Sequence, residues 1–514
     1  MRRLALAALL ALAACRPAPA RPPADAPASE LVEVDIAELG RRMAAGTLSS
    51  RQLTAGYLAR IAALDDAGPR LAAVIELNPR ALDDADALDR ERAAGRVRGP
   101  LHGIPVLIKD NIDVAGLVNS AGSLALADHV PRADAAVVAR LREAGAVILG
   151  KTNLSEWANL RGERSTSGWS SRGGQTRNPY VLDRTPCGSS SGTGAAIAAS
   201  LAAVGVGTET DGSIICPSAV QGLVGLKPTV GLVSRAGIVP SSTSQDTAGP
   251  MARTVADAAA LLAALVDPAA HGERPPDYAA GLNADALRGK RIGVLRQKFG
   301  DLPAVTRATE RALGHLRAAG AELVDPIEIA GWGAWDEHEI ALMLVEYKDG
   351  LDRYLAGTPI ASLAALIAFN RAHADAVMPW FGQELLERAA AAPAVDSPEH
   401  RAAREAARRL AWDEGLGAAL ARHRLDAVVA PALGPAWPID PVLGDRVPDA
   451  GYSVAAVAGT PSLTVPMGDD HGLPLGLVFL GPPRSEADLL AYGYAFEQRA
   501  RARRPPRYLP TLSP

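Results

Sequence analysis

Two serine-rich turns are the strongest chemical feature of the sequence. Residues 186–194 read PCGSSSGTG, and residues 207–217 read GTETDGSIICP. A serine hydroxyl becomes a nucleophile when a base removes its proton, and the glycines beside the serines let the backbone approach closely. The two segments therefore indicate nucleophilic chemistry, provided that Ser189 and Ser213 meet and that a base lies nearby.

The chain between the two turns has the length needed to bring them together. A helix over roughly 192–202 carries the chain about 16 Å away, at 1.5 Å per residue. A strand over about 204–208 returns it by roughly 16 Å, at 3.3 Å per residue. Because the two distances nearly cancel, we expect Ser189 and Ser213 to lie at the same end of a sheet, where α/β proteins generally build their sites.

A lysine ends an apolar run upstream of both turns. Residues 104–109 read IPVLIK, a pattern typical of a buried strand. Burial among the aliphatic side chains of this run would disfavour the ammonium form of Lys109 and leave an amine that can accept a proton. The alternative is a lysine that reaches water at the strand end or pairs with Asp110.

The elements that must position these residues alternate between strand and helix. Short β-rich runs recur along the chain, at 104–109, 146–149, 204–208, 291–295 and 426–430. Helical patterns lie between or beyond them, at 51–64, 195–203 and 338–420. Asp134 can cap a further helix, which Gly145 would end. This alternation indicates an α/β fold with a largely buried sheet.

Composition excludes several classes of protein. The chain has 514 residues, 48% of them hydrophobic and 21% charged, which excludes a disordered, collagen-like or coiled-coil protein. A formal net charge of −4 disfavours nucleic-acid binding, because phosphate recognition usually needs a basic surface. Three cysteines are too few for a disulfide scaffold, and the sequence has no metal-binding motif. Length alone predicts roughly two to four domains.

The first residues are typical of an export signal. Residues 1–15 read MRRLALAALLALAAC, a basic start followed by an apolar run too short to span a bilayer. The end of this run resembles a bacterial lipoprotein cleavage site, in which Cys15 becomes the lipidated first residue. Residues 16–29 are rich in proline and alanine and suit an extended tether. We expect a lipoprotein on the periplasmic side of a bacterial membrane; plain secretion after residues 18–20 and a cytoplasmic protein are the alternatives.

The motifs together resemble the amidase signature family of serine hydrolases. The segments that carry the resemblance are HGIPVLIKDN, GSSSG, GTETDGSI, GLKPTVGLVS and DTAGPMARTVAD. Three further segments are similar to the bacterial peptide amidases within that family: SEWANLRGERSTSGWSSRGGQTRNPY, ICPSA and AVAGTPSLTVPMG. The resemblance covers nearly all of residues 30–505. It implies one catalytic α/β/α domain over 30–514 with a central mixed sheet, in place of several domains.

The resemblance implies a Ser-Ser-Lys triad. By position, Lys109 matches the general base, Ser189 the bridging serine on a cis peptide bond, and Ser213 the nucleophile. A nest of backbone N–H groups could bind the tetrahedral oxyanion, at Thr210, Asp211, Gly212 and Ser213. Ser191 departs from the family pattern, since many members have glycine there, and this bears on the local turn rather than on the triad.

The activity implied by the resemblance is hydrolysis of carboxamides without a cofactor or a metal. The expected substrate is the C-terminal amide of peptides, the expected product is ammonia, and the expected protein is a monomer that binds no nucleic acid. An amidase or esterase acting on other small substrates is one alternative. An amidotransferase component is another, which the export signal argues against. A lipoprotein that only binds a solute would need no such set of three residues.

Other residues near the serines offer competing interpretations. GSSSG also matches the G-x-S-x-G nucleophile elbow, with Ser190 as nucleophile, but the preceding residues read as a turn where the elbow needs a strand. No G-K-[ST] follows that would make the glycines a phosphate loop. Cys187 and Cys216 are expected to be small buried residues, with a disulfide between them as the alternative. His102 is expected to be structural rather than catalytic.

Overall fold

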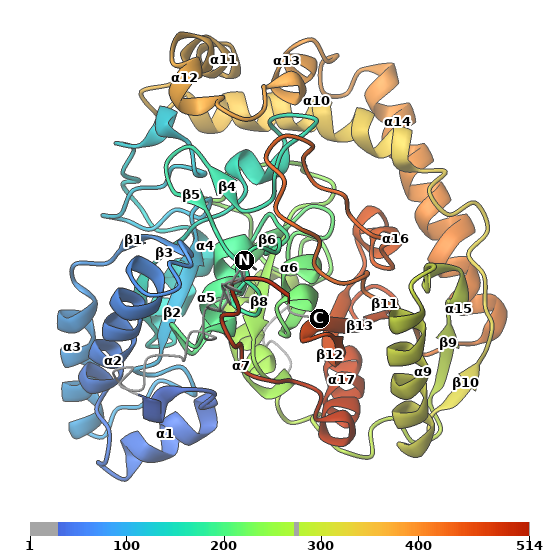
Figure 1. Ribbon diagram of the computed structural model, residues 1–514, viewed down its shortest axis with the longest axis horizontal. Helices are drawn as coiled ribbons and strands as arrows, with labels where there is room; N and C mark the ends of the chain where they lie inside the picture. The colour runs from blue at the N-terminus through green and yellow to red at the C-terminus, as the bar shows by residue number, and fades with distance from the viewer. Residues whose placement is uncertain (1–28, 272–276, 513–514) are drawn as a thin grey trace, which may run out of the picture.

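The centre of the molecule is one mixed sheet of eleven strands within the residues described, 29–271 and 277–512 of the computed structural model (Figure 1). Its strands follow one another across the sheet in the order β1 (Val74–Leu77), β3 (Val147–Thr152), β2 (Pro105–Lys109), β6 (Val204–Glu209), β8 (Thr247–Ala252), β7 (Val224–Lys227), β12 (Ser462–Asp470), β13 (Leu473–Leu480), β11 (Ala427–Pro431), β9 (Arg291–Val294) and β10 (Glu322–Val324). A separate two-stranded sheet pairs β4 (Trp169–Ser170) with β5 (Gly174–Gln175).

Parallel pairing brings the carboxyl ends of β2 and β6, which lead into the site, to one edge of the sheet. β2 runs parallel to both β3 and β6, with Val106 opposite Val204 and Lys109 opposite Thr152. Parallel strands covered on both faces read as continuous apolar runs, which explains the sequence of β2. The carboxyl ends of β2 and β6 therefore lie at the same edge of the sheet.

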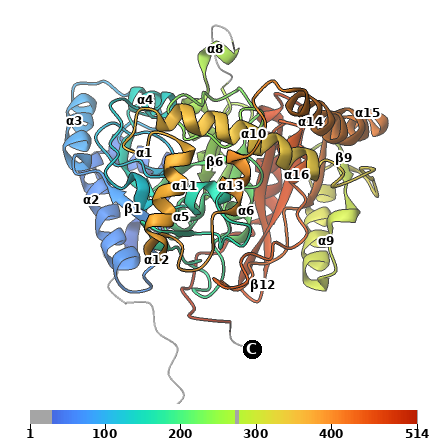
Figure 2. The same cartoon turned by 90° about the horizontal axis from the view of Figure 1, so that it is seen from above.

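Helices cover the sheet and add a further layer across one side. The helices that precede this layer are α1 (Ile36–Ala44), α2 (Ser50–Ile61), α3 (Ala81–Ala93), α4 (Ala136–Glu143), α5 (Ser191–Ala198), α6 (Ile215–Val220), α7 (Val255–Leu265), α8 (Pro268–His271) and α9 (Pro303–Ala318). The layer itself contains α10 (Asp336–Leu355), α11 (Leu363–Ala372), α12 (Ala374–Val377), α13 (Glu384–Ala390) and α14 (Pro398–Arg408). The remaining helices are α15 (Gly417–His423), α16 (Ser453–Val457) and α17 (Glu486–Ala500). Figure 2 shows α10, α11 and α13 in front of β6, α5 and α6.

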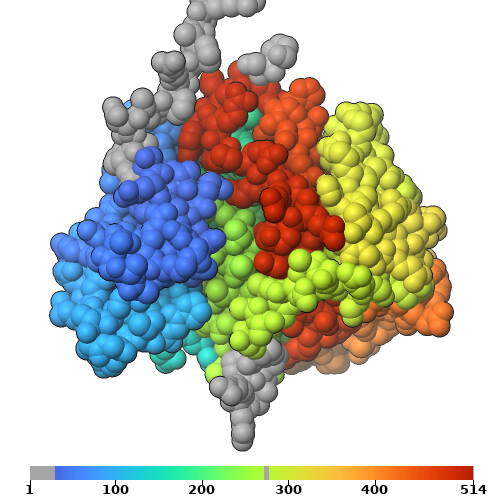
Figure 3. Space-filling model, turned by 90° about the horizontal axis from the view of Figure 1, so that it is seen from below, coloured from blue at the N-terminus to red at the C-terminus, as the bar shows by residue number. Residues whose placement is uncertain are grey.

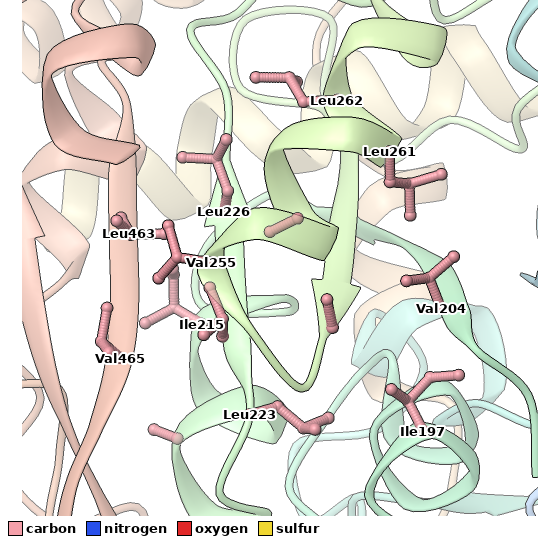
Figure 4. Packing of buried hydrophobic residues seen from close by; sticks show 14 of the residues in the cluster. Ile197, Val204, Ile215, Leu223, Leu226, Val255, Leu261, Leu262, Leu463 and Val465 are labelled. Atoms are coloured by element: carbon pink, nitrogen blue, oxygen red, sulfur yellow. The ribbon is translucent and has the colours of Figure 1, made fainter. Parts of the chain in front are cut away.

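The core is continuous across the sheet. Figure 4 shows aliphatic side chains from several helices and strands meeting between α7 and the sheet, among them Ile197, Val204, Leu226, Val255 and Leu463. All five are fully buried. A second, smaller apolar cluster lies under α10, α11 and α13. The fold is thus a single α/β domain with a central mixed sheet, as expected from the motifs, and the length-based expectation of several domains is wrong.

Two local expectations need correction. The helix between the serine turns ends at Ala198 rather than near residue 202, because Arg60 donates hydrogen bonds to the carbonyls of residues 199 and 200 and Arg253 to those of 197 and 202. Asp134 does not cap α4: its carboxylate accepts from the Ala115 N–H and from Arg142, each at 2.8 Å. Long-range arginine and aspartate contacts override both local patterns.

The two ends of the described chain meet at one ion pair, in which Arg503 contacts Glu33 at 2.7 Å. Figure 3 shows the blue N-terminal residues on one flank, the yellow residues around α9 on the other, and the red C-terminal segment between them. Residues 1–15, including Cys15, and residues 16–28 of the expected tether lie outside the described residues. In the part of the chain that is described, no helix has the length and apolarity to cross a membrane.

Candidate active site

Lys109 is the last residue of β2 and is fully buried. Its Nζ contacts three oxygen atoms: Ser189 Oγ at 2.7 Å, Thr208 Oγ1 at 2.8 Å and the Thr208 carbonyl at 3.3 Å. Asp110 does not pair with it, because that carboxylate binds Lys151 at 3.1 Å. The alternative of a lysine that reaches water or pairs with Asp110 is therefore wrong.

The surroundings of Lys109 favour a neutral amine. Burial lowers the pKa of Lys109 to about 7, while the carboxylates of Asp246 and Glu209 act in the opposite direction. A neutral amine has two N–H groups and one lone pair. The two oxygens of Thr208 can accept the two N–H groups, which leaves the lone pair directed at the Ser189 hydroxyl.

Ser189 follows a cis peptide bond with Gly188, as expected from the motif. A Cβ at Gly188 would collide with Ser155 Oγ, so a side chain there would force Ser155 to move. The Ser189 carbonyl accepts from the Ser155 N–H at 3.1 Å. Ser191, which departs from the family pattern, donates its hydroxyl to the Cys187 carbonyl at 2.6 Å and so stabilises the turn.

Ser213 lies beside the first serine turn. Its carbonyl accepts from the Ser190 N–H at 3.1 Å, which fixes the two turns against each other. The residue is 8% exposed, and its hydroxyl has no hydrogen-bond partner among the described residues. The sequence-based estimate that the turns meet at one end of the sheet is therefore confirmed. Of the serines in GSSSG, Ser189 is the one that reaches Lys109.

The segment before Ser213 is held by side chains from several elements. Thr210 donates its hydroxyl to Asp246 at 2.6 Å, and Asp211 accepts from the Ser453 hydroxyl at 2.8 Å. Gly212 has φ of +76°, and a Cβ there would collide with the Tyr452 ring. Only glycine fits this position, so the turn that aims the backbone N–H groups depends on it.

Glu209 shapes the other side of the same turn. Its carboxylate accepts from the N–H groups of Ile214 and Ile215, at 2.7 and 2.9 Å. Burial raises the pKa of Glu209, while Lys227 and the N–H groups of Ile215, Ile214 and Gly212 lower it. The Gly212 N–H is thus attracted to Glu209, whereas the N–H groups of Asp211 and Ser213 have no acceptor within the described chain.

The competing residues have structural partners. Ser190 is fully buried, donates to the Thr208 carbonyl at 3.0 Å and accepts from the Thr208 N–H at 3.2 Å, so its hydroxyl ties α5 to β6. Cys187 and Cys216 form a disulfide, which removes either thiol as a nucleophile. His102 is buried, with Nε2 3.0 Å from the Leu88 carbonyl, as expected for a structural histidine.

Sequence reasoning missed the residues that surround Lys109 and its hydrogen-bond partners. Asn111 donates to Thr208 Oγ1 at 3.0 Å, and Asp246 and Glu209 supply the nearby negative charge. These residues lie within the segments HGIPVLIKDN, GTETDGSI and DTAGPMARTVAD, so the motifs pointed to the segments but not to the roles of these side chains. Periodicity cannot show them, because their contacts join strands distant in sequence.

Comparison with known proteins places the chain among amidases. The family model named Amidase matches residues 52–490. A probable amidase of Arabidopsis thaliana is 40% identical over 484 residues, covering 90% of this chain and 89% of the plant protein. One component of the glutamyl-tRNA(Gln) amidotransferase of Halorhodospira halophila is 37% identical over 490 residues, covering 90% of this chain and 96% of its own.

The native peptide amidase of Stenotrophomonas maltophilia has the same fold, with a TM-score of 0.90 and 57% identity over 93% of this chain and 99% of that chain. An amidase family protein of Bacillus anthracis has a TM-score of 0.85 and 36% identity, covering 93% of each chain. The protein is thus an enzyme that hydrolyses amides, and the alternative of a protein that only binds a solute is excluded. The chain belongs to the amidase signature family of amidohydrolases.

Proposed function

We propose that this amidohydrolase removes the C-terminal amide of peptides with a Ser-Ser-Lys triad. The observation that carries the proposal is the hydrogen bond between Lys109 Nζ and Ser189 Oγ, which are 2.7 Å apart. The turn of Ser213 lies beside it, held by the bond from the Ser190 N–H to the Ser213 carbonyl. In this proposal Lys109 is the general base, Ser189 relays the proton and Ser213 is the nucleophile. A serine nucleophile needs a base, and the burial of Lys109 favours the neutral amine that can act as one.

Acylation begins with a neutral Lys109. Ser213 gives its proton to Ser189 while Ser189 gives its own to the Lys109 amine, and Ser213 Oγ attacks the carboxamide carbon. The C=O bond becomes a C–O⁻ group in the tetrahedral intermediate. Backbone N–H groups of residues 210–213 stabilise this charge, with those of Asp211 and Ser213 free to donate. The intermediate therefore forms against donors that are already in place.

The proton then returns along the same path. The Lys109 ammonium protonates Ser189, which protonates the departing nitrogen, and the C–N bond breaks to release ammonia and leave an ester on Ser213. Water attacks that ester, and the same relay accepts its proton and returns one to Ser213. The products are a peptide carboxylate and the free enzyme. Protonation of the nitrogen matters because an amide anion is a poor leaving group.

Two solved structures of peptide amidase support the choice of peptide amides. The Stenotrophomonas maltophilia protein, 57% identical to this chain, is a peptide amidase. The peptide amidase PAM, 58% identical with a TM-score of 0.90, is described in complex with chymostatin as a competitive inhibitor. The amidotransferase component of Halorhodospira halophila has a lower identity, 37%. The chain is thus more similar in sequence to these peptide amidases than to this amidotransferase component.

Export to an oxidising compartment is part of the proposal. Residues 1–15 have the pattern of a lipoprotein signal with Cys15 as the lipidated residue, and residues 16–29 would tether the domain to the membrane. The buried disulfide between Cys187 and Cys216 supports this location, because such bonds persist mainly outside the cytosol. The protein would act there as a monomer on small amide substrates.

The decisive experiment is hydrolysis of matched substrates, followed as ammonia release for the amides and as methanol release for the ester. A dipeptide amide, the same dipeptide with a side-chain amide only, the free amino-acid amide and the corresponding methyl ester form the panel. We expect kcat/KM to be highest for the dipeptide amide and near background for the side-chain amide. Preference for the free amino-acid amide, or for the side-chain amide, would contradict the substrate assignment while leaving the triad in place.

A further inference from the structure

The loop before β8, residues 241–246, forms hydrogen bonds to the segment that precedes Ser213. Asp246 accepts the Thr210 hydroxyl at 2.6 Å with one carboxylate oxygen, and the N–H groups of Ser241 and Ser242 at 2.7 and 2.8 Å with the other. Gln245 adds a contact from its Nε2 to the Thr210 carbonyl, at 3.4 Å. Residue 210 is thereby held through both its side chain and its backbone.

Helix α10 fixes this loop from the opposite side. Glu346, which is buried, accepts from the hydroxyls of Ser242 and Ser244 at 2.5 and 2.6 Å and from the Ser244 N–H at 2.9 Å. Gln245 Nε2 also donates to Glu339 of the same helix, at 2.7 Å. The loop is therefore clamped between α10 and the turn of Ser213, and the Asp246 carboxylate has one well-defined position.

The same carboxylate lines a small cavity that two residues of the Lys109 hydrogen-bond network also line. The cavity has a volume of about 170 Å³ and is lined by Asn111, Thr208, Thr210, Arg235 and Asp246, among others. Thr208 and Asn111 belong to the hydrogen-bond network of Lys109. Asp246 thus binds the segment before Ser213 directly and shares a cavity with two residues of the Lys109 network.

We propose that Asp246 is a positioning residue for amide hydrolysis: it anchors the backbone segment that binds the oxyanion, and it places a carboxylate beside the residues that hydrogen-bond to Lys109. The proposal deepens the proposed function and rests on the role of Lys109 as the base. No contact between Asp246 and substrate is required. Both effects act through another residue, Thr210 in the first case and Lys109 in the second.

The charge effect has a definite sign. Ser189 and Thr208 act on Lys109 through hydrogen bonds, and Asp246 and Glu209 act on it through their charges. The groups that act on Asp246 are Thr210, the N–H groups of Ser241 and Ser242, and Arg235. Burial raises the pKa of Asp246 to about 6, so it is mostly ionised at neutral pH. Its negative charge favours the ammonium form of Lys109 and raises the pKa of that amine, against the effect of burial.

The isosteric variant Asp246→Asn separates charge from geometry. The asparagine oxygen can accept the two backbone N–H groups, and its NH₂ can donate to the Thr210 hydroxyl, which is free to rotate. We expect the acid limb of kcat/KM against pH to shift down by roughly half a pH unit or more. The control variant Asp285→Asn removes a carboxylate that is exposed and distant, and should leave the limb unchanged.

Two further variants test the anchoring effect. Asp246→Ala and Thr210→Val should lower kcat by about ten-fold or more with little change in KM, and equally for an amide and an ester, because both reactions form an oxyanion. Thr210→Ser keeps the hydroxyl and should recover most of the activity. Circular dichroism and Tm show whether each variant is folded. A wild-type kcat in folded Asp246→Ala would overturn the anchoring role.

A readout that needs no peptide substrate keeps this inference separate from the substrate assignment. The rate at which a fluorophosphonate acylates Ser213, measured against pH, reports the same base. If Lys109→Ala loses the acid limb of this pH profile but Asp246→Asn keeps the limb at its wild-type pH, Lys109 is the base and the charge effect of Asp246 is overturned. A limb that persists unchanged in Lys109→Ala would overturn the assignment of the base and the charge effect with it.

Discussion

Cys187 and Cys216 form a disulfide that ties the turn of Ser189 to the turn of Ser213. Their Cα atoms are 5.9 Å apart, and 29 residues separate them in sequence. Both are buried, at 4% and 1% exposure. Cys187 comes just before the Gly188–Ser189 bond, and Cys216 lies in the first turn of α6. The covalent bond therefore closes a loop that contains both serines and limits how far they can separate.

Removal of this disulfide should reduce activity as well as stability. We expect the double variant with alanine at Cys187 and Cys216 to lose about 3 kcal/mol of unfolding free energy, because the unfolded chain regains the freedom of the closed loop. kcat should fall while KM changes little, since the serines lose a restraint on their separation. Denaturant unfolding and steady-state kinetics measure both effects. An unchanged kcat at a temperature where the variant is fully folded would limit the disulfide to a role in stability.

Ser213→Ala should remove nearly all amide turnover and leave the fold intact. An acylating probe should label Ser213 in the wild type, and mass spectrometry of the digested protein locates the adduct. Ser190→Ala is the matched control: it should retain labelling but lose stability, because the Ser190 hydroxyl bonds to both the N–H and the carbonyl of Thr208. An adduct on Ser190 would reverse the assignment.

The sequence predicted the central residues of the site because they carry local signals. Lys109 ends an apolar run, and Ser189 and Ser213 lie in glycine-flanked turns whose separation matches one helix and one strand. Asp246 begins the DTAGPMARTVAD segment, but no local pattern showed its role, since its side-chain partner Thr210 lies on another segment. For the same reason the end of α5 was misplaced: Arg60 and Arg253, both remote in sequence, terminate the helix by binding carbonyls at and beyond its end.

Lipid attachment is tested at Cys15. Cys15→Ala should abolish incorporation of a labelled fatty acid and release the protein from the membrane fraction or leave it unprocessed. The wild type grown in the same medium is the positive control. Absence of label on the wild type, with the protein recovered in the periplasmic fraction, would favour plain secretion over a lipid anchor.

Burial of Lys109 should cost stability in a pH-dependent way. The native pKa is about 7 and the ordinary value is 10.5, so between these pH values the unfolded chain binds more protons and wild-type stability rises with pH. The shift corresponds to about 5 kcal/mol at most. Lys109→Met should therefore raise the unfolding free energy most at pH 7 and below, and progressively less towards pH 10. Denaturant titrations at several pH values measure the difference. A gain in stability that is independent of pH would contradict the prediction, because it would mean that Lys109 has the same charge in the folded and the unfolded chain.

The role of Lys109 as base predicts a difference between amides and esters. The acid limb of kcat/KM should lie near pH 7, where Lys109 gains its proton and can no longer accept one from Ser189. Lys109→Ala should slow acylation by about two to four orders of magnitude. Amide hydrolysis should suffer more than ester hydrolysis, because an alkoxide leaves more readily than an amide anion and depends less on the proton that Lys109 returns. Ser189→Ala should show the same bias if it relays that proton.

A matched amide and ester with the same acyl group, assayed with wild type, Lys109→Ala and Ser189→Ala, measures this difference. The buried lysine Lys151 provides the control, because it is fully buried like Lys109 but binds Asp110 and Asn119 rather than a serine. Lys151→Met should lower stability and affect both substrates equally. Equal losses on both substrates in Lys109→Ala would assign Lys109 to structure or binding, because only the proton return distinguishes the two leaving groups. A loss confined largely to the amide, shared by Lys109→Ala and Ser189→Ala and absent from Lys151→Met, is the result that a proton relay through Ser189 requires.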